Sequence, residues 1–166
     1  MRIDSLAVYL NDHLAGSVGA LELLDHLIAE GDRPPIGRVL ATLKADIAED
    51  QAALRALLGR LGIEERRAGK ALAWLGEKVA RLKLRAAGAA NDALQFLEGV
   101  EALALGIQGK AALWRSLVAV AAADDRLSEV DLAALEGRAL DQFARAEALR
   151  LAAAVAAFAA PEPEAE

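Results

Sequence analysis

The stretch DIAEDQAALRALLGRLG, residues 46–62, indicates the class of the fold. Its apolar residues recur three and four positions apart, which is the spacing of one face of an α-helix. The same face extends backwards through Leu40 and Leu43. Asp50 falls in the middle of this apolar face, and Asp46 lies at its edge. The stretch therefore predicts an amphipathic helix that brings a carboxylate into the protein core.

The composition extends this helical pattern to the whole chain. The 166 residues are 55% hydrophobic and only 4% aromatic, and their apolar content is dominated by Ala and Leu, which favour helix over strand. We therefore predict an all-α fold. Turn signals divide the chain into helical segments at about 5–30, 36–62, 70–87, 91–122 and 128–158. Four of them are long enough to form a four-helix bundle, and the short segment 70–87 is expected in the crossover between the second and third long helices.

The length favours one domain, which we place at residues 1–160, followed by a disordered acidic tail at 161–166. No apolar run is long enough to span a bilayer, and the first residues lack a secretory cleavage pattern. We therefore expect a cytoplasmic protein that does not contact membranes. The absence of cysteine excludes disulfides, thiolate metal sites and cysteine nucleophiles.

The charge is unevenly distributed along the chain. The net charge is -6, which argues against general nucleic-acid binding because phosphate neutralisation needs an excess of Lys and Arg. Residues 64–90 nevertheless carry a net +4, so the rest of the chain carries -10. We expect this basic segment to be a solvated helix face or a patch that lies against the acidic remainder, with nucleic acid or a membrane surface as the alternative.

The two histidines lie in the first helical segment, thirteen residues apart in the sequence. At about 100° per residue they point to nearly opposite sides of a helix, so they cannot share a metal ion. His13 and Ser17 fall on or within the apolar stripe, and His26 lies on the far side. His13 is therefore expected to face inward as a hydrogen-bonded core residue, and His26 is expected at the surface.

Each of the four long helices carries a polar or ionisable group at or near its apolar face. Because an isolated buried charge is too costly to keep, these groups are expected to meet in one buried polar cluster. The candidate members are His13, Ser17, Asp46, Asp50, Glu98, Glu101, Glu147 and Arg150. The small residues at positions 16, 19 and 20 of the first segment and the glycines at 99, 106 and 109 of the fourth are expected to allow close approach between helices, which would explain glycines that cost helix propensity.

Several stretches resemble the ferritin-like superfamily. LNDHLAGSVGA at 10–20 is similar to its first-helix pattern, Leu-Asn-x-x-Leu-x-x-Glu, and residues 46–62 are similar to its second helix, which usually carries Glu-x-x-His. AWLGEKVARLKL, EGVEALALGIQGKAALW and RALDQFARAEALRLAAA also resemble a set of uncharacterised bacterial proteins associated with that superfamily. The resemblance covers about residues 6–158 and implies a ferritin-like four-helix bundle.

The departures from the ferritin-like pattern concern the metal ligands. Di-iron members use a Glu from each of two helices and Glu-x-x-His from each of the other two. Here Ser17 stands in place of the first Glu, and the second helix offers Asp46-x-x-Glu49 or Asp50 without a histidine. The last helix offers Glu147-x-x-Arg150. We therefore expect a former metal site converted into an ion-pair cluster. In that cluster the Arg150 guanidinium replaces the charge of the metal among Asp50, Glu101 and Glu147.

These features favour a non-enzymatic structural or interaction protein without a complete di-iron site and without a cofactor. It is expected to act as a homodimer or through an unknown protein partner, because Leu94, Leu97, Leu105 and the segment 70–87 offer more apolar surface than the core needs. The alternative is a carboxylate metal protein, in which carboxylates and His13 hold iron or manganese for redox chemistry or storage. A carrier of apolar ligands, with a cavity between its helices, is a third possibility.

Overall fold

The computed structural model describes residues 2–30, 34–66 and 92–159. Four long helices form the fold: α1 (Ile3–Glu30), α2 (Pro34–Leu61), α4 (Asp92–Val120) and α6 (Leu132–Phe158). The 3-10 turn η1 (Ala121–Ala123) and the short helix α5 (Asp125–Ser128) join α4 to α6. The prediction of an all-α protein with four long helices is confirmed. The stretch 123–128, expected to be a turn, contains the short helix α5 at Asp125–Ser128. The helix expected at 70–87 and the tail expected at 161–166 lie outside the described residues.

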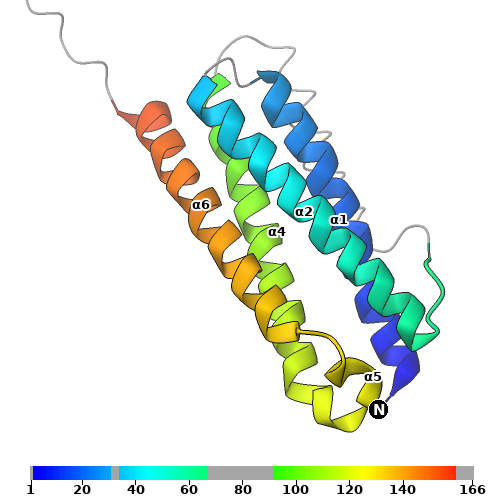
Figure 1. Ribbon diagram of the computed structural model, residues 1–166. Coiled ribbons are helices and arrows are strands. Elements are labelled where there is room, and N and C mark those ends of the chain that lie inside the picture. The colour runs from blue at the N-terminus through cyan, green and yellow to red at the C-terminus, as the bar shows by residue number, and fades with distance from the viewer. Residues whose placement is uncertain (1, 31–33, 67–91, 160–166) are drawn as a thin grey trace, which may run out of the picture.

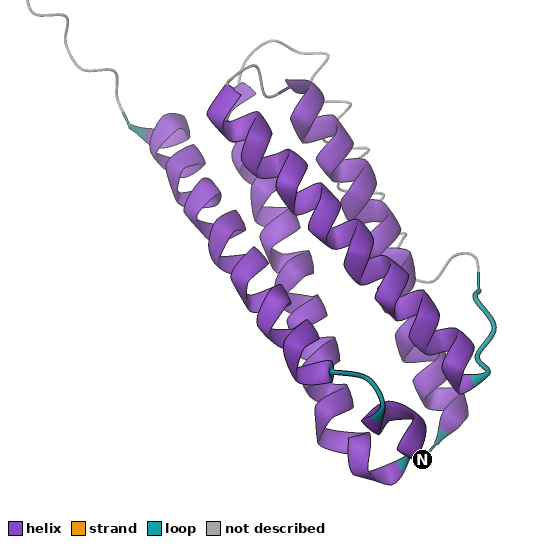
Figure 2. Ribbon diagram, viewed as in Figure 1, coloured by secondary structure: helices purple, strands orange, loops and turns teal. Residues whose placement is uncertain are grey.

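The four helices pack as an antiparallel bundle (Figure 1). α1 and α6 run in one direction and α2 and α4 in the other, and each helix of one pair contacts both helices of the other pair. α4 begins at the end of the bundle opposite to the one where α2 ends, which is the arrangement of bundles with one long crossover. Within the described ranges every regular element is helical (Figure 2), and none of these helices is both long and apolar enough to cross a membrane.

α2 ends just before Gly62, whose backbone adopts the left-handed conformation that favours glycine. Gly62 has a φ of +69°, which a residue with a side chain rarely adopts. The N–H of Ile63 donates to the carbonyl of Leu58 at 2.9 Å, and the N–H of Gly62 donates to that of Gly59 at 3.1 Å. These two bonds form a Schellman motif, which satisfies the last carbonyls of α2 and turns the chain back toward the core.

Two polar side chains hold chain segments that adjoin the bundle. Asn11 of α1 is buried; its Oδ1 accepts from the N–H of Arg66 at 2.6 Å, and its Nδ2 donates to the carbonyl of Glu64 at 3.1 Å. The chain that follows α2 is thereby fastened to α1. Asp131 caps α6 by accepting from the N–H of Ala134 at 2.9 Å, so the last long helix begins at Leu132 and not at the predicted residue 128.

The buried faces of the helices follow a seven-residue repeat. Alternating steps of three and four residues keep one face of a helix turned toward its neighbours in left-handed bundle packing. The runs are Leu40, Leu43, Ile47, Asp50, Leu54, Leu57 and Leu61 on α2, and Leu132, Leu135, Ala139, Gln142, Ala146, Leu149 and Ala153 on α6. Both runs are apolar except for one position in the middle of each helix.

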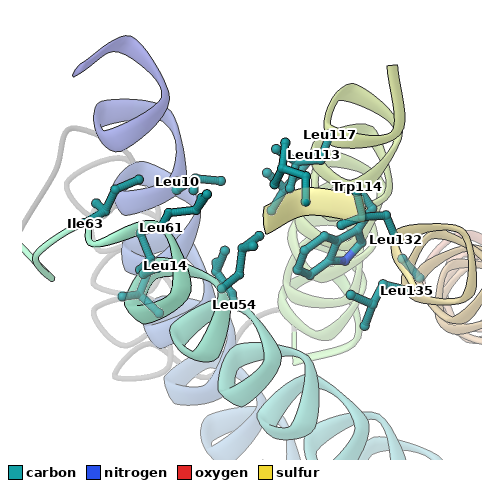
Figure 3. Packing of buried hydrophobic residues seen from close by; sticks show 14 of the residues in the cluster. Leu10, Leu14, Leu54, Leu61, Ile63, Leu113, Trp114, Leu117, Leu132 and Leu135 are labelled. Carbon is teal, nitrogen blue, oxygen red and sulfur yellow. The ribbon is translucent and has the colours of Figure 1, made fainter. Parts of the chain in front are cut away.

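The apolar core is divided into two clusters along the bundle. The first lies toward α5 and includes Leu10, Leu54 and Trp114, and the second lies toward the opposite end and includes Leu24, Leu40 and others. Figure 3 shows the first cluster, in which the indole ring of Trp114 from α4 lies among leucines from α2 and α6. The boundary between the two clusters coincides with the polar positions in the middle of the helices.

Candidate functional site

A layer of polar side chains crosses the bundle between the two apolar clusters. Each long helix contributes one residue at a core position of its repeat: Ser17 from α1, Asp50 from α2, Lys110 from α4 and Gln142 from α6. We call these four residues the central polar layer. Asp50 and Gln142 are only 2% and 1% exposed. Such groups are tolerated in a core only if their hydrogen-bonding atoms find partners.

Asp50 is the centre of this layer. Its Oδ2 accepts from Nζ of Lys110 at 2.5 Å and from Nε2 of Gln142 at 2.9 Å. Nζ of Lys110 also donates to Oε1 of Gln142, so the three side chains form a closed triangle. On the outer side the guanidinium of Arg138 lies 2.7 Å from Oδ1 of Asp50 and 3.2 Å from the exposed carboxylate of Glu49.

The ammonium group of Lys110 is shielded from most of the surrounding water. Its side chain is 14% exposed, and that of Asp50 is 1% exposed. Burial lowers the pKa of Lys110 because it disfavours the charged form, while the neighbouring Asp50 carboxylate acts in the opposite direction. Each member of the pair therefore depends on the other to remain charged inside the bundle.

A cavity of about 360 Å³ opens beside the central polar layer, between α1, α2 and α4. Its walls are mainly apolar and include one aromatic ring from each of α1 and α4. Polar atoms enter it from the layer and from the neighbouring turns of α1 and α2. The lining residues are Tyr9, Asp12, His13, Gly16, Ser17, Ala20, Ile47, Asp50, Gln51, Leu54, Gly106, Ile107, Gly109, Lys110, Leu113 and Trp114.

The glycines of α1 and α4 have two different structural roles. A Cβ atom at Gly99 would lie 2.8 Å from Cδ2 of Leu27, so this glycine allows α1 and α4 to approach closely, as predicted. The same prediction is wrong for Gly16, Gly106 and Gly109, where a Cβ atom would have no neighbour within 4 Å. These three glycines line the cavity and leave its space unfilled.

On α1, His13 and Ser17 both line the cavity. The His13 ring packs edge-on against Tyr9, with 4.7 Å between the ring centroids. Burial lowers the pKa of His13, and the nearby Asp12 partly opposes this shift, so the imidazole is neutral at pH 7. Ser17 donates to the carbonyl of Leu14 at 2.7 Å.

Gln51 joins Ser17 to α2, with its Nε2 donating to the serine Oγ at 2.9 Å. The Oε1 of Gln51 accepts from the guanidinium of Arg55 at 2.7 Å. The other histidine differs from its prediction, because His26 is partly buried and its Nε2 does not contact water.

The predicted cluster divides into separate ion pairs in the structure. Arg150 hydrogen-bonds Glu147 at 2.7 Å and lies 3.8 Å from Glu101, as expected, but the predicted pairing with Asp50 is wrong. Asp50 pairs with Lys110 and Arg138 instead. The hydrogen bonds from Arg150 lower the pKa of Glu147, and Glu147 raises the pKa of Arg150.

The reason for this error is the helical repeat of α6. A stripe drawn at 3.6 residues per turn passes through Phe143 and Arg150, whereas the seven-residue repeat passes through Gln142 and Leu149. Arg150 therefore lies at the edge of the buried face, with 26% of its side chain exposed.

The remaining predicted residues lie around this arrangement. Asp46 pairs with Arg145 at 2.6 Å on the α2–α6 side. Glu98 is partly buried, and Glu101 is half exposed. In the ranges 2–30, 34–66 and 92–159, no three His, Cys, Asp or Glu residues come together as a possible metal site. The structure thus brings His13, Ser17 and Asp50 to one cavity and places the other candidates elsewhere.

The sequence interpretation missed Lys110 and Gln142, although a signal for Lys110 was present. The apolar stripe of α4 passes through Ile107 and then Trp114, a step of seven residues. A seven-residue step in a helix skips one inward position, and here that position is residue 110. Gln142 had no such signal, because Phe143 beside it fits the stripe equally well by spacing.

Replacing Arg150 with leucine tests its position. The guanidinium lies at the edge of the bundle, and both it and its carboxylate partners are partly exposed to water. We therefore expect the melting temperature to change by only about one or two degrees at pH 7. Thermal unfolding followed by circular dichroism provides the measurement, with Arg115→Leu as the exposed control. A loss of ten degrees or more would show that Arg150 neutralises buried carboxylates after all.

Comparisons with known proteins identified no relative of this chain. No protein-family model matched it, and neither the curated proteins nor the solved structures contained a match. The fold is therefore described from its own coordinates as an all-α bundle of four long helices. Its resemblance to ferritin-like proteins stays a prediction.

Proposed function

We propose that this protein is a non-enzymatic helical bundle that binds a small, mainly apolar molecule in the cavity between α1, α2 and α4. The cavity is the observation that supports this function. Pockets for small molecules are typically concave, mostly apolar and supplied with a few well-placed polar groups. At roughly 30 Å³ per heavy atom, the volume of one water, a cavity of about 360 Å³ accommodates about a dozen atoms.

The glycines that line the cavity add to this support. Glycine in a helix interior costs about 1 kcal/mol relative to alanine. Gly99 has a packing reason for this cost, because Leu27 fills the space that a side chain would need. Gly16, Gly106 and Gly109 have no such neighbour and face one shared space. A bound molecule that needs this space would account for Gly16 and Gly109, which are partly buried, whereas Gly106 is exposed and part of the space beside it is solvent.

Two further predictions, a ferritin-like origin and a homodimer, are compatible with this proposal. The antiparallel arrangement with one long crossover is the arrangement of ferritin-like bundles, and we propose a distant relationship on that basis. A homodimer stays a prediction: Leu105 is exposed, whereas Leu97 is buried inside the bundle. Light scattering at tens of micromolar protein tests the dimer.

The metal-binding alternative also stays a prediction. Metal analysis of protein purified without a histidine tag tests it, with near-stoichiometric iron or manganese as the supporting result. Loss of that metal on replacing Asp50 would place it at the central polar layer.

Binding of decan-1-ol tests the proposed function, because its eleven heavy atoms match the space available. We expect saturable binding of about one molecule per chain, measured by calorimetry or ligand-observed NMR. Gly109→Leu should abolish it, because the new side chain enters the cavity. Gly59→Leu is the matched control, since this helical glycine also has open space around it but lies on the outside of α2. Absence of saturable binding, or equal binding by both variants, would contradict the proposal.

A further inference from the structure

We propose that the ligand is an amphipathic carboxylic acid, with its carboxylate between Lys110 and His13 and its apolar chain along the cavity walls. This inference rests on the proposed function and assigns the chemical class of the ligand. Lys110 enters the cavity from α4, and His13 enters it from α1. Both residues therefore line one space, from two helices that contact each other.

Within the part of the chain that the structure describes, the hydrogen-bonding capacity of Lys110 and His13 is only partly used. The ammonium of Lys110 has three N–H donors, and its bonds to Asp50 and Gln142 use two of them. Among the residues that the structure describes, His13 contacts Tyr9 through its ring and makes no hydrogen bond. A neutral imidazole retains one N–H donor and one acceptor. One charged and one neutral donor are thus available to an acceptor group in the cavity.

The unused N–H of the Lys110 ammonium favours an anionic acceptor, because a hydrogen bond from an ammonium to a carboxylate is stronger than one to a neutral oxygen. The carboxylate of Asp50 faces two cations, Lys110 and Arg138. The second carboxylate near Arg138 belongs to Glu49, whose side chain is 71% exposed and therefore largely screened by water. The Arg138 side chain is also 42% exposed, so inside the bundle the charges of Lys110 and Asp50 balance each other, and a ligand carboxylate would bind through the remaining N–H of Lys110. A phosphate would add more charge and more acceptors than one ammonium and one imidazole can satisfy.

Of the described residues, two carboxylates line the cavity and oppose an anion: Asp50, which is paired with Lys110, and Asp12. Asp12 is partly buried on α1, one residue from His13. Its carboxylate repels an incoming anion and should weaken the binding of a carboxylic acid without preventing it. Removing the charge of Asp12 should therefore strengthen the binding of a carboxylic acid.

The test compares three molecules with the same ten-carbon chain on the full-length protein at pH 7.5: decanoate, decan-1-ol and decylammonium. We expect decanoate to bind about tenfold more tightly than decan-1-ol, as one charge-assisted hydrogen bond allows, and decylammonium to bind most weakly. Equal affinities for decanoate and decan-1-ol would overturn this inference and leave the proposed function standing. Failure of all three to bind would overturn both, and preferential binding of decylammonium would show that Asp12 and Asp50 select the head group.

Variants locate the head group. In Lys110→Met combined with Asp50→Asn, which leaves no buried charge unpaired, the preference for decanoate should disappear while decan-1-ol still binds. Lys44→Met is the control, because this lysine is partly exposed and pairs with Asp25 away from the cavity. Asp12→Asn, which keeps the central polar layer intact, should tighten decanoate binding several-fold and leave decan-1-ol unchanged. An unchanged preference in both cavity variants would overturn the placement.

Discussion

Replacing Asp50 with leucine is expected to destabilise the protein by about 3–5 kcal/mol, the usual cost of removing one member of a buried ion pair. The carboxylate is 1% exposed and accepts hydrogen bonds from Lys110 and Gln142. Without it, the Lys110 ammonium would remain inside the bundle with a single polar partner on Gln142. Urea unfolding of the variant and the parent at pH 7 measures the difference. A loss of less than about 1 kcal/mol would show that the layer is open to water.

The same variant should regain stability relative to the parent as the pH rises. Burial already lowers the pKa of Lys110, and loss of Asp50 removes the neighbour that raises it. The unfolded chain keeps its lysine protonated up to a pKa of about 10.4. Above the folded-state pKa the unfolded state therefore binds more protons, and the free energy of unfolding increases with pH. The deficit should be smaller at pH 9.5 than at pH 7.

Replacing all three hydrogen-bonded residues, Asp50, Lys110 and Gln142, distinguishes two causes of lost stability. One is the cost of an unpaired buried charge, and the other is the loss of the interactions among the three side chains. A variant with Asp50→Leu, Lys110→Met and Gln142→Leu leaves no member unpaired and continues the apolar repeat of three helices. Because apolar replacement of complete buried ion pairs is often neutral or stabilising, most of the lost stability should return. If the triple variant is as unstable as Asp50→Leu alone, the loss comes from packing at these positions and not from an unpaired charge.

Replacing Trp114 with alanine is expected to cost about 3–5 kcal/mol, because it removes the largest side chain of the cluster near α5. The indole is 1% exposed and packs against residues of α1, α2 and α6. Its Nε1 is buried and has no hydrogen bond to a residue in the described ranges. Trp114→Phe therefore removes packing volume but no hydrogen bond, so its cost should be much smaller than that of the alanine variant.

Urea unfolding of both Trp114 variants, followed by circular dichroism, measures this contrast. Equal losses for alanine and phenylalanine would contradict the packing explanation, because they would mean that the indole nitrogen, and not the ring volume, stabilises the cluster. A loss below about 1 kcal/mol for alanine would mean that neighbouring leucines close the space that the ring leaves.

The ends of the helices were largely predictable because they depend on local chemistry. Gly62 stops α2 by adopting a backbone conformation that other residues avoid. The start of α6 was placed too early, at 128, because Asp131 caps this helix by accepting from the N–H of Ala134. The inward position of Asp50 was also predictable, because Ile47 three residues before it and Leu54 four residues after it continue the apolar face on both sides. These signals involve residues within one or two turns of the same helix.

The sequence by itself determined the helical class, the four long segments and the presence of a carboxylate in the core. Only the tertiary structure decided which cation meets that carboxylate: Lys110 lies sixty residues away from Asp50, and Arg150 misses the core by one position on α6. The physical reason is that supercoiled packing rotates each helix slightly over many turns, so a one-residue error in register replaces Gln142 with Phe143. The cavity was likewise undetermined, because a glycine has the same local preferences whether a leucine fills the space beside it, as at Gly99, or nothing does, as at Gly109.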